Sequence, residues 1–367
     1  MPISAADSIS LAFEHTRKQL FQPFRFGQWI RLAIVGLLAG ELSSSGGCNR
    51  SNFFPTRPGA PSHSPFPHFP AIDLALFASL IAVIVIAAIV IGIIFMYISS
   101  VMRFILFDSV LAKQCHIRDG WMRRQGPGWR FFLWKLFYLF ATLAGFAVLL
   151  GVPAAFAFGM GWLTAPKEHA LPLALGGILL FFALLIYVIA LAVIFVLTKD
   201  FVVPQMALEE IGVFEGWRRL WPMIEVEKAS YAGYIGMKIV LAIGAGIMVA
   251  VATAILGLLI AIPTIGLSII AIVTGKTAGL TWNAYTITLA VVIGSILLAI
   301  FLFLVALISV PVIVFFPAYS IYFFASRYPA LSASLYALAQ PAPQPFVAPP
   351  IPPQQPPPLP PTPQPAG

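Results

Sequence analysis

Residues 74–101 decide the fold and read LALFASLIAVIVIAAIVIGIIFMYISSV, with no Asp, Glu, Lys, Arg or His among them. About 20 apolar residues are enough for a helix to cross the hydrocarbon core of a bilayer. A backbone in hydrocarbon must satisfy its own hydrogen bonds, so the stretch is a helix or part of a closed barrel. Barrel strands alternate apolar and polar residues, and this stretch does not. It therefore predicts a transmembrane helix.

Four further blocks of the same kind follow along the chain. The composition agrees, since 60% of the 367 residues are hydrophobic and only 9% are charged, whereas soluble domains are about 25% charged. We therefore expect an all-α integral membrane protein. The five strong spans are predicted at 74–101, 136–163, 171–197, 236–262 and 286–316.

A weaker sixth candidate precedes them, at residues 24–42. Its apolar part is short, and Arg31 stands near its start, where a long basic side chain can snorkel to the headgroups. We interpret it as a first span, with a half-membrane or interfacial helix as the alternative. Residues 1–28 are expected to form a cytoplasmic amphipathic lead-in, and residues 29–330 the six-helix membrane domain.

The basic residues predict the orientation. With six spans, all but four of the 21 Lys and Arg residues fall on one side, and the four exceptions are Arg50, Arg57, Lys167 and Lys276. Cytoplasmic loops carry the excess of basic residues. We therefore expect a multi-pass inner-membrane protein with both termini in the cytoplasm. The net charge of +8 is explained by orientation and lipid headgroups, and it does not indicate nucleic-acid binding.

Two cytoplasmic segments, here called the elbows, resemble each other at an offset of 96 residues, the separation of Arg103 and Lys199. IRDGWMR at 117–123 aligns with VFEGWRR at 213–219, sharing an acidic residue, Gly, Trp and Arg. A partial third copy relates Trp29 to Trp134. Basic residues recur just inside each outward span, at Arg31, Lys135 and Lys238. The pattern predicts three related helical hairpins joined by amphipathic elbow helices.

The elbows hold the candidate binding residues. Trp and Arg at a span boundary suit the headgroup layer, so simple anchoring of the protein at the interface is one interpretation. The other is a site for a lipid headgroup or another ligand. Its candidate residues are Asp119, Trp121, Arg123, Arg124, Glu215, Trp217, Arg218 and Arg219.

Residues 331–367 are expected to form a disordered cytoplasmic tail, because the segment is rich in proline and its last 27 residues carry no charge. Such a chain favours the extended polyproline II conformation. Two PxxP spacings, Pro349 to Pro352 and Pro358 to Pro361, are of the kind that aromatic grooves recognise. The tail is therefore either a spacer or a segment that captures a cytoplasmic protein.

No catalytic motif accompanies these features, and we expect neither a metal site nor a cofactor. The outer-loop histidines His63 and His68 are too few for a defined metal site. Coupled transporters usually carry ionisable groups within the membrane, and the interiors of the five strong spans contain none. The favoured function is a non-enzymatic accessory or scaffold protein at the lipid interface. The alternative is a transporter or channel for an uncharged or amphiphilic solute.

Several short motifs carry a family resemblance: FRFGQW at 24–29, a Gly-rich first external loop, DFVVP at 200–204 and the Gly216-Trp217 pair. In these the chain resembles a poorly characterised family of bacterial multi-helix membrane proteins. That family is related to the membrane domain fused to some glycerophosphodiester phosphodiesterases. The resemblance covers about residues 10–330 and implies a membrane module. No region outside the membrane is long enough for a catalytic barrel of about 250 residues, so it does not imply phosphodiesterase activity.

Overall fold

The structure is a computed structural model that describes residues 3–41, 74–162, 167–277 and 284–337. Within these ranges the regular elements are all helical, and one of them, η1, is a single π-helical turn. The elements are α1 (Asp7–Phe21), α2 (Phe26–Ala39), α4 (Leu74–Leu111), α5 (Ile117–Gly159), α6 (Ala170–Leu197), η1 (Thr198–Val202), α7 (Val203–Glu209), α8 (Val213–Val226), α9 (Lys228–Thr277), α10 (Ala284–Ile308), α11 (Val310–Ala325) and α12 (Pro329–Ala337).

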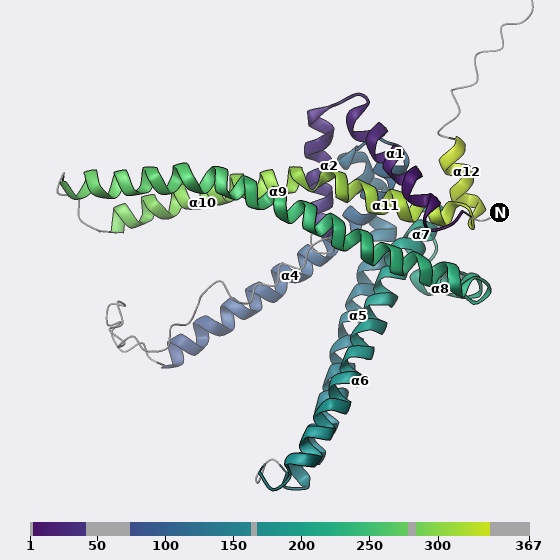
Figure 1. Cartoon of the computed structure of the whole chain (residues 1–367), viewed down its shortest axis with the longest axis horizontal. Coiled ribbons are helices and arrows are strands. Elements are labelled where there is room, and N and C mark those ends of the chain that lie inside the picture. Colours follow the sequence, from purple (N-terminus) through teal and green to yellow (C-terminus); the bar gives the residue numbers. More distant parts are fainter. Residues whose placement is uncertain (1–2, 42–73, 163–166, 278–283, 338–367) are drawn as a thin grey trace, which may run out of the picture.

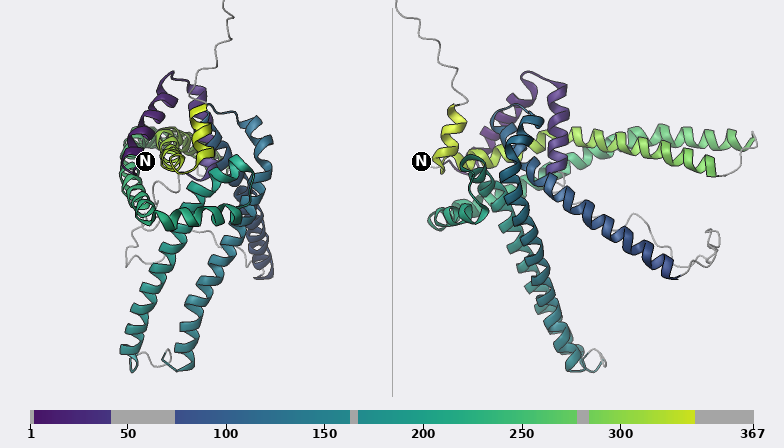
Figure 2. Two further views of the ribbon diagram at one scale, coloured as in Figure 1. Left: turned by 90° about the vertical axis from the view of Figure 1, so that its right-hand side faces the viewer. Right: turned by 180° about the vertical axis from the view of Figure 1, so that it is seen from behind.

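Three apolar arms project from the molecule in different directions (Figure 1). The first is formed by residues 78–96 of α4, the second by residues 139–196 of α5 and α6, and the third by residues 239–305 of α9 and α10. Figure 2 shows α5 beside α6. No described residue of any arm is buried within the protein. The arms therefore expose their apolar side chains along their whole described length.

The remaining described residues form a compact body, which we call the hub. It contains α1, α2, the C-terminal part of α4, the N-terminal parts of α5 and α9, and all of η1, α7, α8, α11 and α12. Every buried residue of the described chain lies in the hub. The chain thus separates into a packed body and three uncovered extensions.

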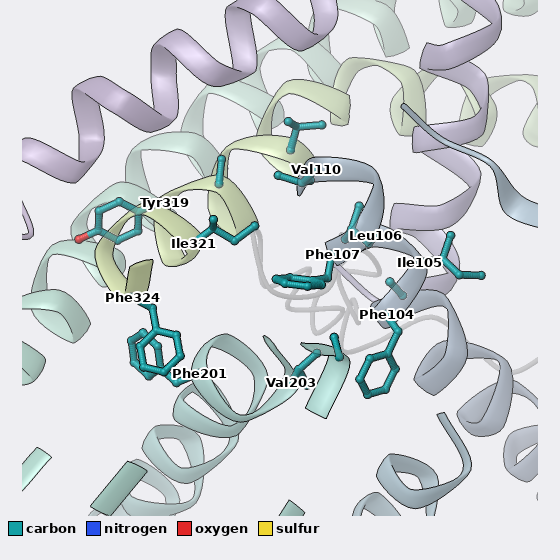
Figure 3. Close-up of a cluster of buried hydrophobic side chains, with 14 of the residues drawn as sticks. Phe104, Ile105, Leu106, Phe107, Val110, Phe201, Val203, Tyr319, Ile321 and Phe324 are labelled. Carbon is teal, nitrogen blue, oxygen red and sulfur yellow. The ribbon is translucent and has the colours of Figure 1, made fainter. Parts of the chain in front are cut away.

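Aromatic side chains fill the hub core where α4, η1 and α11 meet (Figure 3). Phe201 lies 5.2 Å from Phe324 between ring centroids, and Tyr234 stacks on Tyr319 at 5.0 Å. Such rings bury large apolar areas, and ring pairs add about 0.5–1.5 kcal/mol beyond that burial. These contacts join segments far apart in sequence and fix the hub.

Five described helices are long and apolar enough to cross a membrane, whereas the sequence predicted six. The five segments are Ala78–Leu111, Ile117–Gly159, Ala170–Glu209, Lys228–Gly275 and Tyr285–Ala325. In the first four, none of the most apolar 18-residue window is buried. The chain is thus all-helical and has the helices of a multi-pass membrane protein.

The structure does not confirm the first span predicted at 24–42, because the helix described there is short. α2 has 14 residues and is therefore about 21 Å long, which is less than the hydrocarbon thickness of about 30 Å. The helix stops at Gly40, whose φ of 79° places it in the left-handed region that ends many helices. One face, including Leu32, Val35 and Gly36, is buried in the hub. The alternative of a shorter, interfacial helix fits better.

The end of the chain also differs from expectation. The span 286–316 was predicted as one helix, but it contains most of α10 and the first part of α11. The two helices are separated by a break at Ser309, close to Pro311 in the first turn of α11. The tail predicted from residue 331 begins no earlier than 338, since α12 continues to Ala337 with Leu331 and Leu335 buried. Residues 338–367 lie outside the described residues, and their disorder remains a prediction.

The first and last described helices lie together in the hub. α1 runs along α11 (Figure 1), and Nη1 of Arg327 donates a hydrogen bond to the carbonyl of Ile3 at 3.2 Å. Residues 3 and 337 therefore belong to one body. That this body faces the cytoplasm remains a prediction.

Candidate functional site

The first elbow lies at the start of α5, and its predicted residues have different environments. Asp119 and Arg123 are exposed. Trp121 is partly buried and directs its ring edge at Tyr97, with 6.2 Å between centroids. Arg124 points inward and binds the Asp108 carboxylate through two hydrogen bonds of 2.7 Å. The first elbow thus presents two exposed basic groups without an ion-pair partner among the described residues, Arg118 and Arg123, whereas Arg124 is paired with Asp108.

The second elbow, in α8, pairs its charges locally. Glu215 accepts from Arg218 at 2.6 Å and from Arg219 at 3.2 Å, and Arg219 also bonds to Glu209. The hydrogen bond from Arg219 lowers the pKa of Glu215. Nε1 of Trp217 donates to Oγ1 of Thr198 at 3.0 Å, which ties the elbow to η1.

The two elbows are built alike around a glycine. A Cβ on Gly120 would lie 3.1 Å from the Ile105 side chain, and a Cβ on Gly216 would lie 2.6 Å from the Val202 side chain. Gly120 and Gly216 are separated by the same 96 residues as the two elbows. Val202, by contrast, lies one position later in the chain than the residue that this offset pairs with Ile105. The π-helical turn η1 accommodates one extra residue. The two glycines thus have similar tight contacts, and the internal repeat remains a prediction.

The first elbow is bonded to α7 rather than to the second elbow, since Nη1 of Arg124 donates to the carbonyl of Ala207 at 2.6 Å. Within the described part of the chain, no hydrogen bond or ion pair joins the 117–124 motif to the 213–219 motif. A single ligand site shared by the two motifs therefore remains a prediction. The tail residues Pro349, Pro352, Pro358 and Pro361 lie outside the described residues.

A second group of charges lies deeper, where the arms join the hub. Oε1 of Glu41 accepts from Nη1 of Arg103 at 2.6 Å, and Oε2 accepts from Nζ of Lys199 at 2.5 Å. The Glu41 side chain is only 3% exposed. Nη2 of Arg103 donates to the Ala39 carbonyl at 2.7 Å, at the end of α2. The short helix α2 thus ends on an ion pair that connects it to α4 and η1.

Asp200 forms the second half of this group. Its carboxylate binds the ammonium of Lys238 on α9 and accepts a hydrogen bond of 3.0 Å from the hydroxyl of Tyr234. Nearby, Nζ of Lys135 on α5 donates to Oγ of Ser99 at 3.2 Å. We call the six ionisable residues the hub ion cluster: Glu41, Arg103, Lys135, Lys199, Asp200 and Lys238.

A cavity of about 30 Å³ adjoins the cluster. Its polar lining comes from Glu41, Arg103, Lys199, Asp200 and Ser320. The apolar wall comes from α4, α7 and α11. This volume holds one or two water-sized groups. The cluster is therefore a partly open polar site within an otherwise apolar body.

Sequence analysis placed the functional residues at the elbows and missed this cluster. The interiors of the five strong predicted spans contain no charged residue. The helices continue beyond these spans, however, and the basic residues on the continuations lie in the hub. A signal was present, because Arg103 aligns with Lys199 in the repeat and Lys135 and Lys238 recur just inside outward spans. Glu41 gave no such signal, because its role depends on where α2 ends.

His15 is a separate buried polar group, at the junction of α1, α4 and α11. Its Nε2 lies 2.9 Å from the carbonyl of Val110 and its Nδ1 lies 3.1 Å from the hydroxyl of Tyr322. Burial, helped by the positive charge of Lys113, lowers the pKa of His15 to about 4. The neutral imidazole thus connects three helices at neutral pH.

Comparison with known proteins gives one match. Residues 3–334 match the model of DUF7544, described as a family of unknown function. No curated protein and no solved structure matches the chain. The resemblance to the membrane domain of glycerophosphodiester phosphodiesterases stays a prediction.

Proposed function

Because the chain belongs to this family of unknown function, we propose its role from its own residues: it is a non-enzymatic accessory or scaffold protein at the surface of a lipid bilayer. The observation that carries the proposal is the distribution of burial, since no described arm residue is fully buried and most are exposed, while the hub is packed. Exposed apolar arms are stable in hydrocarbon. A hub whose surface combines basic residues with exposed aromatic side chains such as Trp129 and Trp221 is stable at the edge of the bilayer.

The proposed topology follows from the same division. The second and third arms enter the inner membrane as the hairpins α5–α6 and α9–α10, and the hub, with both termini, lies on the cytoplasmic side. Five spans alone would leave the two ends of the chain on opposite sides, so the proposal requires one further crossing of the chain before residue 74. Three features support this arrangement: the excess of basic residues on one side, the joining of α1 to α11, and arms that carry no Asp, Glu, Lys, Arg or His between the hub and residues 167–169 or 276. In a bilayer the three arms must align more closely than in Figure 1. The helix break at Ser309 and the π-helical turn η1 lie where such bending would occur.

Exposed elbow arginines are the proposed points of contact with anionic headgroups. Arg123 is exposed without an ion-pair partner among the described residues, and the Arg218 side chain is 78% exposed although it contacts Glu215. Trp121 and Trp217 pack partly into the hub, so they act as anchors rather than as contacts that can be freely removed.

The test combines Arg123→Gln with Arg218→Gln in the full-length protein and measures the anionic lipid that co-purifies. We expect less anionic lipid with the double variant. The matched control is Met122→Ala with Gln125→Ala, which changes exposed elbow residues without changing charge. Equal lipid recovery from all three proteins would contradict a role for the elbows at the lipid interface.

Two further assays separate the remaining possibilities. A scaffold produces no solute flux in liposomes, whereas the alternative transporter or channel for an uncharged or amphiphilic solute does. Crosslinking and affinity recovery with and without residues 341–367 tests capture of a cytoplasmic protein by the tail. Loss of a recovered partner on truncation would assign that role to the PxxP segments.

A further inference from the structure

The hub ion cluster carries more positive than negative charge. Four basic side chains stand against the two carboxylates of Glu41 and Asp200. The paired side chains are largely shielded from solvent, with exposures of 3% for Glu41, 8% for Arg103, 9% for Lys199 and 5% for Asp200. Burying charge without a partner is costly. The cluster therefore has an electrostatic preference for an additional anion.

Hydrogen bonding in the cluster leaves donors unused. Both oxygens of Glu41 are engaged, one by Arg103 and one by Lys199. Among the described residues, Nε of Arg103 is buried and has no acceptor, and Lys135 has the Ser99 hydroxyl as its one hydrogen-bond acceptor. An oxyanion with several acceptor oxygens would satisfy donors that two carboxylates do not.

The cavity is shaped for a small anionic group. Arg103, Lys199 and Ser320 line it together with the carboxylates of Glu41 and Asp200, and apolar side chains such as Phe107 and Phe316 complete the lining. Its volume of about 30 Å³ admits the oxygens of one group, while the rest of a larger molecule would remain outside the partly open mouth. Apolar walls strengthen charge interactions by excluding water.

The position of the cluster indicates which anion is available. Arg103 on α4, Lys199 on η1 and Lys238 on α9 each lie where an arm leaves the hub. If the arms occupy hydrocarbon, this level is that of the lipid phosphates. We propose that the hub ion cluster binds a phosphate group, held by Arg103 and Lys199, belonging to a lipid headgroup or to a free phosphate. The lipid source rests on the proposed function, whereas the phosphate chemistry does not.

Glu41 competes with the phosphate for the same two donors. Replacing it by Gln removes a negative charge and releases Arg103 and Lys199 from their ion pairs. Glu41→Gln should therefore bind phosphate more tightly than the wild type, even though the variant is less stable without ligand. A purely structural ion pair predicts the loss of stability but no gain in phosphate binding.

The experiment measures the unfolding temperature of the full-length protein with two probes. One probe is inorganic phosphate against chloride at equal ionic strength, in a detergent with a neutral headgroup. The other is phosphatidylglycerol in phosphatidylcholine nanodiscs, against phosphatidylcholine alone. The proteins are the wild type, Glu41→Gln, Lys199→Gln and the exposed-charge control Lys228→Gln.

We expect at least one probe to raise the wild-type unfolding temperature, by on the order of 3 °C at a concentration about ten times the dissociation constant. The rise should be larger for Glu41→Gln, and binding should be about tenfold or more weaker for Lys199→Gln. Lys228→Gln should keep the same rise in unfolding temperature as the wild type. If Lys199→Gln does not fold, the comparison of Glu41→Gln with wild type still decides.

If phosphatidylglycerol raises the unfolding temperature and inorganic phosphate does not, the bound phosphate belongs to a lipid headgroup. If inorganic phosphate raises the unfolding temperature, the site binds free phosphate. The absence of any rise in the wild type, an equal rise in Lys199→Gln, or no gain in Glu41→Gln overturns the proposal. The Arg123 and Arg218 double variant could lose anionic lipid while the unfolding temperatures of the cluster variants change with each probe as the wild type's does. That result would support the proposed function and exclude phosphate binding at the hub ion cluster. The two failures are therefore distinguishable.

Discussion

The hub and the arms obey different physical rules, although single helices run through both. In α4, residues 78–96 are uncovered and uncharged, whereas the following turns bury Phe104 and Ile105 and direct Arg103 at Glu41. In α9, Lys238 reaches Asp200 only a few residues before the exposed side chains of the third arm begin. Stability within the protein therefore resides in the hub, while the surroundings must stabilise the arms. The comparison teaches that a substitution's effect depends on which side of this boundary it lies.

The largest expected effect is at the ion cluster. Arg103→Gln leaves Glu41 buried with one cation fewer and removes the bond to the Ala39 carbonyl. Breaking one partner of a buried pair costs about 3–5 kcal/mol. Reversible unfolding in mixed micelles measures this loss. A loss below about 1 kcal/mol would mean that solvent reaches the cluster and screens it.

Glycine-to-alanine substitutions sharpen the comparison, because they should lower the stability in the hub and raise it in an arm. In the hub, a Cβ on Gly128 would lie 2.6 Å from Cγ2 and 3.2 Å from Cα of Val101, so Gly128→Ala should destabilise by about 1–3 kcal/mol. In the first arm, nothing lies within 4 Å of a Cβ on Gly92. Gly92→Ala should stabilise by up to about 1 kcal/mol through helix propensity. The same unfolding assay compares them, and equal effects would remove the distinction.

Acid should weaken the hub through His15. The unfolded side chain titrates near pH 6.5, whereas the folded one has its pKa lowered to about 4, so the unfolded state binds the proton more strongly. The contribution is complete above pH 6.5 and falls by about 1.4 kcal/mol per pH unit from there towards pH 4. Unfolding curves of wild type and His15→Gln between pH 7 and pH 4.5 measure it. Parallel pH dependence in the two proteins would exclude His15 as the cause.

The smallest effect is expected on the outside of an arm. Leu179 on α6 is 73% exposed, and exposed positions usually change stability by no more than about 0.5 kcal/mol. Leu179→Ala should therefore unfold almost as the wild type does in micelles. A loss of about 2–5 kcal/mol, as in a packed core, would show that another protein surface covers this arm.

Much of the arms could be predicted from sequence, because long uncharged stretches have few physical solutions. The repeat of Gly120 and Gly216 was also readable, and both glycines occupy equivalent tight contacts. The hub was less accessible, since its core joins residues such as Phe201 and Phe324 that have no local pattern linking them. α2 was assigned as a span on hydropathy, and its length depends on a left-handed Gly40 followed by the buried Glu41.

The hub-and-arm division is tested most directly by spin labels in a bilayer. Single cysteines, in a background with Cys48→Ser and Cys115→Ser, would replace Val85, Ile186 and Met248 in the three arms and Met122 and Arg218 in the hub. Collision rates with oxygen and with a water-soluble nickel complex report depth. The account predicts labels accessible to oxygen and shielded from nickel in all three arms, with the reverse at both hub positions. Water-exposed labels in any arm would contradict it.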